Sequence, residues 1–311
     1  MISSKEDSIF LSLICGKLLG DGCFIHQHGR KPRFQFMHKQ TDFEWCHYCY
    51  EQLRSFIPLN PPFYRKVKDI RVVKGYTESY MVQSKTAGII THLDTIWYPV
   101  RKKVVPIHFL EKYLNERALA WWYLDDGHLK IDHNIPRKII LSTDNFSSDE
   151  NFSLIKLLKQ KFSLSFSLDG QNRLVLYDSL QIHYFYQLIK PFIHPSMSRK
   201  TIQTNSEVNK KFPNRTSIYL PAKITLKKPT YEINEHLCSL SQLYLQLNNQ
   251  EDYLNYYKKY FLHIAAIKST KSYQISIEPR YRYELQKIHQ LTGLNNSQIV
   301  TLCFMLSMND F

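Results

Sequence analysis

The chain has 311 residues, and its 41 Lys and Arg residues against 27 Asp and Glu residues give a formal net charge of +14. This excess favours a polyanion, above all nucleic acid, as the partner; a basic surface kept for solubility is the alternative. Apolar residues (43%) and aromatic residues (14%) are abundant enough to exclude wholesale disorder. Six irregularly spaced Cys residues favour a reducing compartment over a disulfide framework. The most apolar N-terminal stretch, residues 9–15, is too short to span a membrane, so no membrane partner is expected.

The first predicted element is a helix that is apolar on nearly all sides and ends in an acid followed by glycine (SIFLSLICGKLLGDG, residues 8–22). Such a helix is buried, and glycine just after the last turn is a usual C-terminal stop. Two short strands (CFIHQH and RFQFMH), a helix over residues 41–56, a strand pair (FYRKV and SYMVQ) and a closing helix over residues 86–97 are predicted to follow.

The same order of elements is predicted a second time. Another apolar helix, in ERALAWWYLDDG (residues 116–127), again ends in an acid and glycine. Two strands (HLKI and KIILST), a helix over residues 147–162 opened by the capping sequence SSDE, a hairpin across DGQN and a closing helix over residues 179–190 follow it. The terminal acids Asp21 and Asp126 lie about 100 residues apart, so a duplicated unit is the economical interpretation.

The chain beyond the second unit changes character. Residues 190–228 carry nine Lys and Arg residues, one acid and four prolines, which predicts a basic, loop-rich connector rather than a core element. Helical periodicity returns over residues 231–260. The last forty residues predict a strand and two helices, an order that resembles a ribbon-helix-helix DNA-binding module at residues 271–311, with Tyr273, Gln274 and Ser276 as strand candidates. Such modules normally dimerise; the alternative is a small helical appendage that packs on the core.

The two helix-terminal acids carry the chemical argument. A carboxylate at a helix C-terminus is unfavourable because the helix dipole places partial negative charge there. If the two ends pack together, Asp21 and Asp126 share one location with free carbonyl groups, and only a cation makes that arrangement favourable. Hard oxygen ligands suit Mg²⁺, and metal ions held in this way could activate water for phosphodiester cleavage. A single Asp-Gly would be interpreted as a turn after a core helix; two in matched contexts favour the metal site.

The segments ICGKLLGDG (residues 14–22) and LAWWYLDDG (residues 119–127) resemble the paired signature of LAGLIDADG homing endonucleases. The resemblance extends over residues 8–200 and includes the repeat spacing and element order. It implies an α+β fold of tandem pseudo-twofold repeats, helix-strand-strand-helix-strand-strand-helix, at residues 1–106 and 107–204, followed by a basic connector and C-terminal extension at residues 205–311. The signature helices would pack at the centre, and each curved antiparallel sheet would lie in the DNA major groove.

The resemblance also implies the active-site residues. Asp21 and Asp126 match the acids that bind Mg²⁺ or Mn²⁺, with the carbonyl groups of Gly20 and Asp125 beside them. The second motif departs from the family, whose interface positions tend to be small, because it has Trp121 and Trp122 there and Asp125 replaces a small residue. This resembles the WYLDDG variant of a branch that includes organellar intron maturases. Two adjacent acids leave open which one is the ligand, and Asp126 is preferred because it directly precedes Gly127.

The family often places a basic residue near each acid. The segments IWYPVRKKVVP (residues 96–106) and IKPFIHPSMSRK (residues 189–200) follow the two closing helices, and aligning their ends suggests Lys103 and Lys200 for this role. A solvated basic loop near DNA is an equal alternative for each residue.

Polar and basic residues on the predicted strands are candidates for contacts with DNA. RFQFMHK places Arg33, Gln35 and Lys39 on one face, and Arg and Gln are side chains that read guanine and adenine edges. Each candidate is more often a phosphate contact than a base reader. The full set is His26, His28, Arg33, Gln35, Lys39, Arg65, Lys66 and Lys68 in the first repeat, and Lys130, Arg137, Lys138 and Arg173 in the second.

The leading hypothesis is a monomeric, single-chain homing endonuclease that cuts double-stranded DNA with a divalent metal. The composition, poor in Gly and rich in Lys, Ile, Asn, Tyr and Phe, fits an organellar gene, in a chloroplast or mitochondrion. One alternative is a maturase that binds its own intron RNA and assists splicing; another is a non-cleaving DNA-binding protein on the same scaffold. Retention of both acids favours the enzyme, because a binding protein has no need for two repelling carboxylates.

Overall fold

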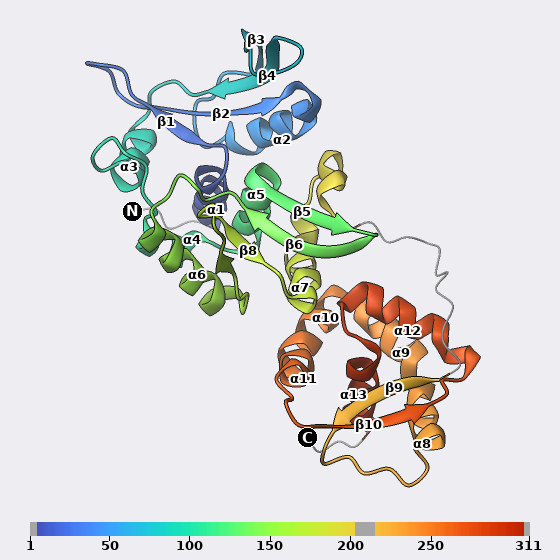
Figure 1. Cartoon of the computed structure of the whole chain (residues 1–311). Helices are drawn as coiled ribbons and strands as arrows, with labels where there is room; N and C mark the ends of the chain where they lie inside the picture. Colours follow the sequence, from blue (N-terminus) through green and yellow to red (C-terminus); the bar gives the residue numbers. More distant parts are fainter. Residues whose placement is uncertain (1–4, 203–214, 308–311) are drawn as a thin grey trace. The chain divides into compact units, whose positions relative to one another are not determined.

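The computed structural model describes residues 5–202 and 215–307, and these form two compact units (Figure 1). The first unit comprises Met1–Tyr177 and Ile189–Thr201, and the second comprises Asp178–Leu188 and Ile202–Phe311. The second unit therefore takes all of α7 (Ser179–Ile189) except its last residue from the segment predicted to close the second repeat. No described helix is both long and apolar enough to cross a membrane.

The first unit contains two antiparallel four-stranded sheets with the same strand order. One sheet has the order β1-β2-β4-β3 and the other β5-β6-β8-β7. The strands of the first sheet are β1 (Cys23–Ile25), β2 (Arg33–Lys39), β3 (Phe63–Lys68) and β4 (Tyr76–Gln83). Those of the second are β5 (Gly127–Asp132), β6 (Ile135–Leu141), β7 (Ser167–Leu168) and β8 (Leu174–Leu176). The repeated topology confirms the predicted α+β fold class.

The helices of the first unit follow the repeat as well. The first half contains α1 (Lys5–Leu19), α2 (Phe43–Leu53) and α3 (Gly88–Trp97). The second half contains α4 (Ile107–Tyr113), α5 (Glu116–Asp126) and α6 (Ser148–Phe162), and α6 begins with the expected capping box between Ser147 and Glu150. The short helix α4 was not predicted from the sequence.

Helices α1 and α5 pack against each other between the two sheets (Figure 1). Gly16 on α1 and Gly20 directly after its last residue allow this approach. A Cβ atom at Gly16 would lie 2.4 Å from the carbonyl oxygen of Ala118, and one at Gly20 would lie 2.5 Å from the Cβ of Asp125. The opposing positions on α5 are filled by Trp121 and Asp125. The predicted buried helix pair is thus present, with small residues on one helix and large residues on the other.

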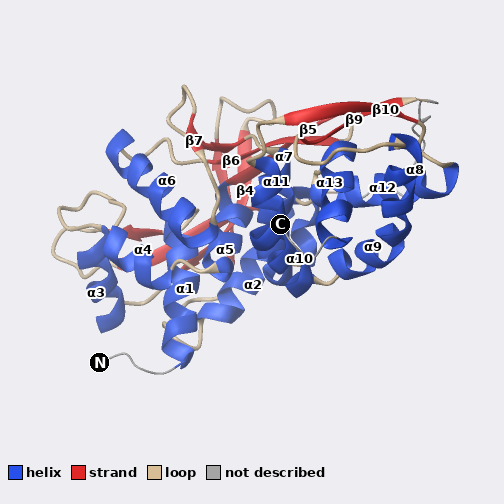
Figure 2. Ribbon diagram, turned by 90° about the horizontal axis from the view of Figure 1, so that it is seen from below, coloured by secondary structure: helices blue, strands red, loops and turns tan. Residues whose placement is uncertain are grey.

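The second unit contains the order strand-helix-helix twice. Strands β9 (Thr216–Pro221) and β10 (Thr270–Ile275) pair antiparallel as a two-stranded ribbon, which lies along one side of the unit's helices (Figure 2). Helices α8 (Pro229–His236) and α9 (Leu240–Asn248) follow β9, and α12 (Pro279–Thr292) and α13 (Asn296–Ser307) follow β10. Helices α10 (Gln250–Tyr256) and α11 (Leu262–Ala265) connect the two halves.

Two expectations for this part of the chain are corrected. The segment predicted as a connector contains β9, whose Ile218 and Leu220 are fully buried, so that prediction is wrong for these residues; residues 203–214 of the segment lie outside the described residues. Tyr273 was a candidate on the strand expected to contact DNA, but it is buried and its hydroxyl donates to the carbonyl of Ile224 at 2.9 Å. A ribbon formed within one chain also replaces the dimer expected of the module.

Candidate active site

The ends of α1 and α5 bring the two predicted acids together. Asp21 follows the last turn of α1, Asp126 is the last residue of α5, and the backbone N–H of Asp21 donates to the Asp125 carboxylate at 3.2 Å. The dipoles of both helices place negative charge at this location, where the carboxylates already repel one another. The structure thus brings together the two acids that the repeated motif predicted, and their role as metal ligands stays a prediction.

The two acids respond differently to these surroundings. Burial, followed by the charges of Asp21 and Asp125, raises the pKa of Asp126 to about 7, although Lys103 and Lys200 oppose the shift. Burial also acts to raise the pKa of Asp21, but the hydrogen bond and charge of His38, with smaller contributions from Lys17 and Lys200, lower it overall. Asp21 is therefore held as a carboxylate, while burial and then charge repulsion favour the neutral form of Asp126.

The carboxylate of Asp125 is fully buried and already has several partners. Lys17 donates to its two oxygens at 2.8 and 3.0 Å, and the indole N–H of Trp45 donates to Oδ1 at 2.9 Å. Both Lys17 and Asp125 have side-chain exposures of 0%. Burial alone would lower the pKa of Lys17, but the neighbouring Asp125 carboxylate outweighs it, and the pKa rises above its ordinary value. Asp125 thus serves a buried ion pair across the helix interface.

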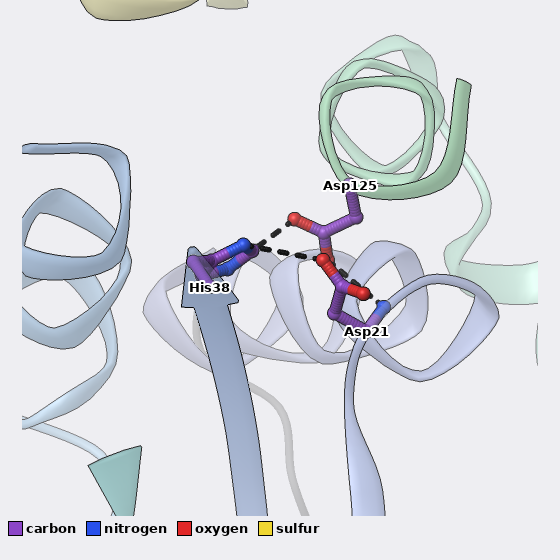
Figure 3. Close-up of side chains that lie close together, drawn as sticks. All are labelled: Asp21, His38 and Asp125. Carbon is purple, nitrogen blue, oxygen red and sulfur yellow. Dashed lines mark hydrogen bonds and ion pairs between the residues drawn. The ribbon is translucent and has the colours of Figure 1, made fainter. Parts of the chain in front are cut away.

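His38, on the buried face of β2, links this ion pair to Asp21 (Figure 3). Its Nε2 lies 2.9 Å from Nζ of Lys17, and its Nδ1 lies 3.2 Å from Oδ2 of Asp21. Since an ammonium group can only donate, Nε2 must accept, which places the imidazole proton on Nδ1, from which it is donated to Asp21. The network orients the Asp21 carboxylate through a side chain that the sequence reasoning did not select.

Proximity alone would make Asp21, His38 and Asp125 a metal site, since each offers a ligand atom within 4.8 Å of the others. We do not favour this set, because the Lys17 ammonium already lies at 2.8 Å from Asp125 and 2.9 Å from His38. The outward oxygen of Asp21, whose side chain is 32% exposed, and the carboxylate of Asp126 are better placed chemically to receive a cation. The preference for Asp126 over Asp125 as the metal ligand stays a prediction, and these contacts favour it.

Lys103 and Lys200 both reach the helix ends, as their positions in the repeats suggested. Nζ of Lys103 donates to the carbonyl of Gly22 at 3.0 Å. Nζ of Lys200 donates to the carbonyls of Leu124 and Asp125 at 2.7 and 2.9 Å. Burial lowers the pKa of both lysines despite the nearby acids. Lys200 therefore offsets the negative end of α5, whereas Lys103 contacts the residue between Asp21 and β1. Metal-binding roles for the carbonyls of Gly20 and Asp125 stay predictions, and the Asp125 carbonyl already accepts from Lys200.

The predicted DNA-facing residues of the first repeat lie mainly on β2 and β3. Phe34, Phe36 and His38 are buried, so the opposite face of β2 is the open one, as the alternation predicted. Arg33, Gln35 and Lys39 lie on that open face of β2, and Arg65, Lys66 and Lys68 lie on β3, all of whose residues are exposed. His28 is exposed in the loop after β1, whereas His26 contacts Asp94 at 2.8 Å and is engaged within the chain.

The second sheet places two lysines side by side. Lys130 of β5 pairs in register with Lys138 of β6, and like charges directly opposite on neighbouring strands are destabilising. A polyanion bound to this face would relieve that repulsion. Arg137 is 3.3 Å from Asp132, and Arg173 donates to Asp169 at 2.7 and 3.0 Å within the β7–β8 hairpin. Arg173 therefore already stabilises the turn between β7 and β8, and its role in binding DNA stays a prediction.

The residues that sequence reasoning missed are Lys17, His38 and Trp45. They come from α1, β2 and α2 and meet around Asp125, so no local spacing connects them. One signal was present: a lysine inside an otherwise apolar helix in one motif and an extra aspartate in the other. Two departures of opposite charge in paired motifs indicate a buried ion pair between them.

Comparisons with known proteins agree with this arrangement. The profile described as "LAGLIDADG DNA endonuclease family" matches residues 11–180. The chain is similar to probable intron-encoded endonuclease 1 of Wickerhamomyces canadensis, with 28% identity over 61% of this chain and 82% of that protein. It is also similar to cytochrome b mRNA maturase bI2 of Debaryomyces hansenii, with 26% identity over 62% of this chain and 74% of that protein. Among solved structures, the homing endonuclease I-WcaI bound to its DNA recognition sequence matches with a TM-score of 0.57 and 22% identity, over 65% of this chain and 89% of that one.

Proposed function

This chain belongs to the LAGLIDADG DNA endonuclease family, and from that premise we propose that it is a homing endonuclease that hydrolyses phosphodiester bonds at a specific site in double-stranded DNA. The observation that carries the proposal is the pair of acids at the ends of α1 and α5. Burial, followed by repulsion from Asp21 and Asp125, raises the pKa of Asp126 to about 7 beside the ionised Asp21, which costs stability unless a cation binds. A protein that only binds DNA gains nothing from this arrangement.

The donor set fits Mg²⁺ or Mn²⁺. Asp21 and Asp126 supply carboxylate oxygens, which Mg²⁺ prefers, and both nitrogens of His38 already face other side chains. A divalent ion held there would supply an activated water and stabilise the leaving oxygen of the phosphodiester. His38 orients Asp21 from the protein side, and Lys103 and Lys200 place positive charge beside the acids, where the scissile phosphates would lie.

The two sheets supply the surface for DNA. The open face of β2 carries Arg33 and Gln35, the paired Lys130 and Lys138 lie on the second sheet, and the similar I-WcaI structure holds its DNA recognition sequence. One chain contributes both helix ends, so we propose that a monomer forms the site. We also propose an organellar location, since the similar cytochrome b maturase acts on a cytochrome b mRNA by its name.

Substituting Asp126 by Asn, or Asp21 by Asn, tests the proposal. Each variant loses one carboxylate of the pair, so we expect cleavage in Mg²⁺ to fall by at least about 1000-fold, consistent with the loss of several kcal/mol of transition-state stabilisation. Binding to the same duplex in Ca²⁺ should remain within about threefold of wild type, since phosphate contacts dominate affinity. The substrate is a duplex that joins the exons flanking the reading frame in its host gene.

Asp144→Asn is the matched control, because it removes the same charge from an exposed aspartate in the loop after β6. It should cleave like wild type. Wild-type protein that binds the joined-exon duplex but never cuts it in Mg²⁺ or Mn²⁺ would overturn the nuclease proposal.

A maturase is the second candidate function, and the similarity to cytochrome b mRNA maturase bI2 favours keeping it. It predicts that the wild type promotes splicing of its own intron RNA and that Asp126→Asn splices equally well. Splicing that depends on the protein, together with absent DNA cleavage, would make the maturase the function of this chain.

A further inference from the structure

The ribbon of β9 and β10 is a feature that the endonuclease core does not use. It lies in the second unit, and the family match ends at residue 180, before either strand begins. We propose that the outer face of this ribbon is a second binding surface for double-stranded DNA. The ribbon would lie in the major groove of that DNA. The inference goes beyond the proposed function, because it concerns binding outside the cleavage core.

The two faces of the ribbon differ sharply. Ile218 and Leu220 of β9 and Tyr273 and Ile275 of β10 are buried against the helices of the unit. The alternate positions are exposed and carry hydrogen-bonding side chains. These outward residues are Ser217 and Tyr219 on β9, paired in register with Gln274 and Ser272 on β10. A single polar patch two strands wide thus faces away from the core.

Positive charge in the described part of this unit gathers around the ribbon. Residues 215–228 and 266–278, the strands with their loops, carry six basic residues and one acid, Glu278. The helical residues 229–265 and 279–307 carry five basic and five acidic residues, so they are neutral overall. All six basic residues near the ribbon are exposed: Arg215, Lys223, Lys227, Lys228, Lys268 and Lys271. A polar patch bordered by cations is complementary to base edges between two phosphate backbones.

The width of the ribbon decides between nucleic acids. The major groove of B-form DNA is about 12 Å wide and admits a two-stranded ribbon, whereas the major groove of A-form RNA is too deep and narrow for side chains to read. Ser272, Gln274 and Tyr219 carry hydroxyl and amide groups. Side chains with these groups contact bases or phosphates in DNA complexes.

A second copy of the chain is a poorer occupant, because backbone groups beside the ribbon are already satisfied. The N–H of Tyr219 donates to Oγ of Ser297 at 3.0 Å. The buried amide of Asn234 donates to the carbonyl of Ser276 at 2.9 Å and accepts from the N–H of Glu278 at 2.9 Å. These contacts leave less for a partner strand to pair with, while the outer side-chain face stays open.

The test compares two charge-matched double variants of the full chain. Lys227→Gln/Lys268→Gln removes two exposed lysines beside the ribbon, and Lys258→Gln/Lys259→Gln removes two exposed lysines from the helical side. Binding in Ca²⁺ to a mixed-sequence duplex of about 60 base pairs is measured over a range of salt concentrations. Each lost phosphate contact lowers the slope of log affinity against log salt by about 0.9, so the ribbon variant should lose between about 1 and 2, and the helical variant close to zero.

The second readout is hydroxyl-radical footprinting on a duplex of the same length that contains the joined-exon target, so that the cleavage core binds at one fixed position. The wild type should protect a segment flanking the core footprint, and the ribbon variant and Gln274→Ala should lose that protection while the core footprint remains. Equal slopes for the two double variants would overturn the inference, as would a ribbon variant that loses affinity for hairpin RNA but not for the duplex. A wild type whose self-association is abolished only by the ribbon substitutions would also overturn it.

These outcomes separate the inference from the proposed function. If wild-type protein cuts its target and Asp126→Asn does not, but both double variants bind like wild type, only the ribbon inference fails. If no duplex is cut, yet the ribbon variant alone loses salt dependence, the nuclease proposal fails and the ribbon surface stands.

Discussion

Lys17 and Asp125 are the residues at which the two signature segments depart from each other in charge. Each is fully buried, and the ion pair at 2.8 Å joins α1 to α5 directly beneath the acids. A buried pair contributes little net stability compared with apolar residues of similar size, but removing one partner leaves an uncompensated charge. The pair therefore fixes how the helix ends meet, and His38, which contacts Lys17 and Asp21, transmits that arrangement to the outer acid.

Replacing Lys17 by Met should destabilise the first unit by about 3–5 kcal/mol, because the Asp125 carboxylate would remain buried without its cation. The double variant Lys17→Met/Asp125→Leu should recover most of that loss, since neither charge remains. All four Trp residues lie in the first unit, so urea unfolding followed by Trp fluorescence reports on this unit alone.

Lys31→Met, at an exposed lysine in the loop between β1 and β2, is the control and should change stability by no more than about 0.5 kcal/mol. A double variant as unstable as Lys17→Met would contradict the argument, because it would show that the two charges do not act as a pair.

At the scale of elements, the interface between α1 and α5 is asymmetric. Gly16 of α1 and Gly20, directly after that helix, face α5, which fills the space with Trp121 and Asp125. Family members tend to have small residues on both sides, so here one helix compensates for bulk on the other. The close approach of the two helices depends on α1 having no side chains at these two positions.

Gly16→Ala should therefore be costly. A Cβ atom would lie 2.4 Å from the backbone oxygen of Ala118, which cannot move aside without shifting α5. We expect a loss of about 1–3 kcal/mol by Trp-monitored unfolding, together with reduced cleavage, because the helix ends would separate. Gly88→Ala, at the first residue of α3 with no atom within 4 Å of the added Cβ, should be neutral or slightly stabilising. Equal effects at the two positions would contradict this account.

The elements that sequence predicted best were those with strong local signals. The buried signature helices, the capped α6 and the hairpin of β7 and β8 each carry their own pattern of caps, turns or periodicity. The strand β9 was missed because it is short and follows a run of Lys and Pro residues, and its pairing partner β10 lies about fifty residues away. Strand pairing over that separation leaves no mark in a local window.

The residues of the candidate site likewise fall into those that a local or repeated pattern predicts and those that only the fold brings together. Asp21, Asp126, Lys103 and Lys200 could be located because duplicated motifs place them at equivalent positions. Asp125 was seen, but its buried partners come from separate elements that meet only in the folded chain. The open face of β2 was predicted correctly, since alternation along one strand is local, whereas the engagement of Arg173 with Asp169 was not foreseen.

At the scale of the whole molecule, two electrostatic effects act in opposite directions as pH rises. A chain with net charge +14 and 13 His residues repels itself less as its histidines lose protons, which favours folding. Asp126 acts the other way. Its pKa is about 7 in the folded chain against an ordinary 3.8, so the folded state holds a proton that the unfolded state has released over this interval. The stability from Asp126 is complete below about pH 4 and is lost as pH rises through about 7.

Comparing the wild type with Asp126→Asn separates the two effects, because Asn does not titrate and the general charge is otherwise shared. In EDTA the two proteins should have similar Tm values near pH 4.5. The Tm of the Asn variant should then rise relative to that of the wild type up to about pH 7.5, where the difference should reach at least about 3 °C. A free-energy difference of roughly 1 kcal/mol produces a shift of that size in a unit of this length. Saturating Ca²⁺ at pH 7.5 should reverse the order, because the cation binds the wild-type carboxylate pair and stabilises the folded state by mass action. A Tm difference that stays constant with pH, or that Ca²⁺ leaves unchanged, would show that Asp126 is not a strained carboxylate awaiting a cation.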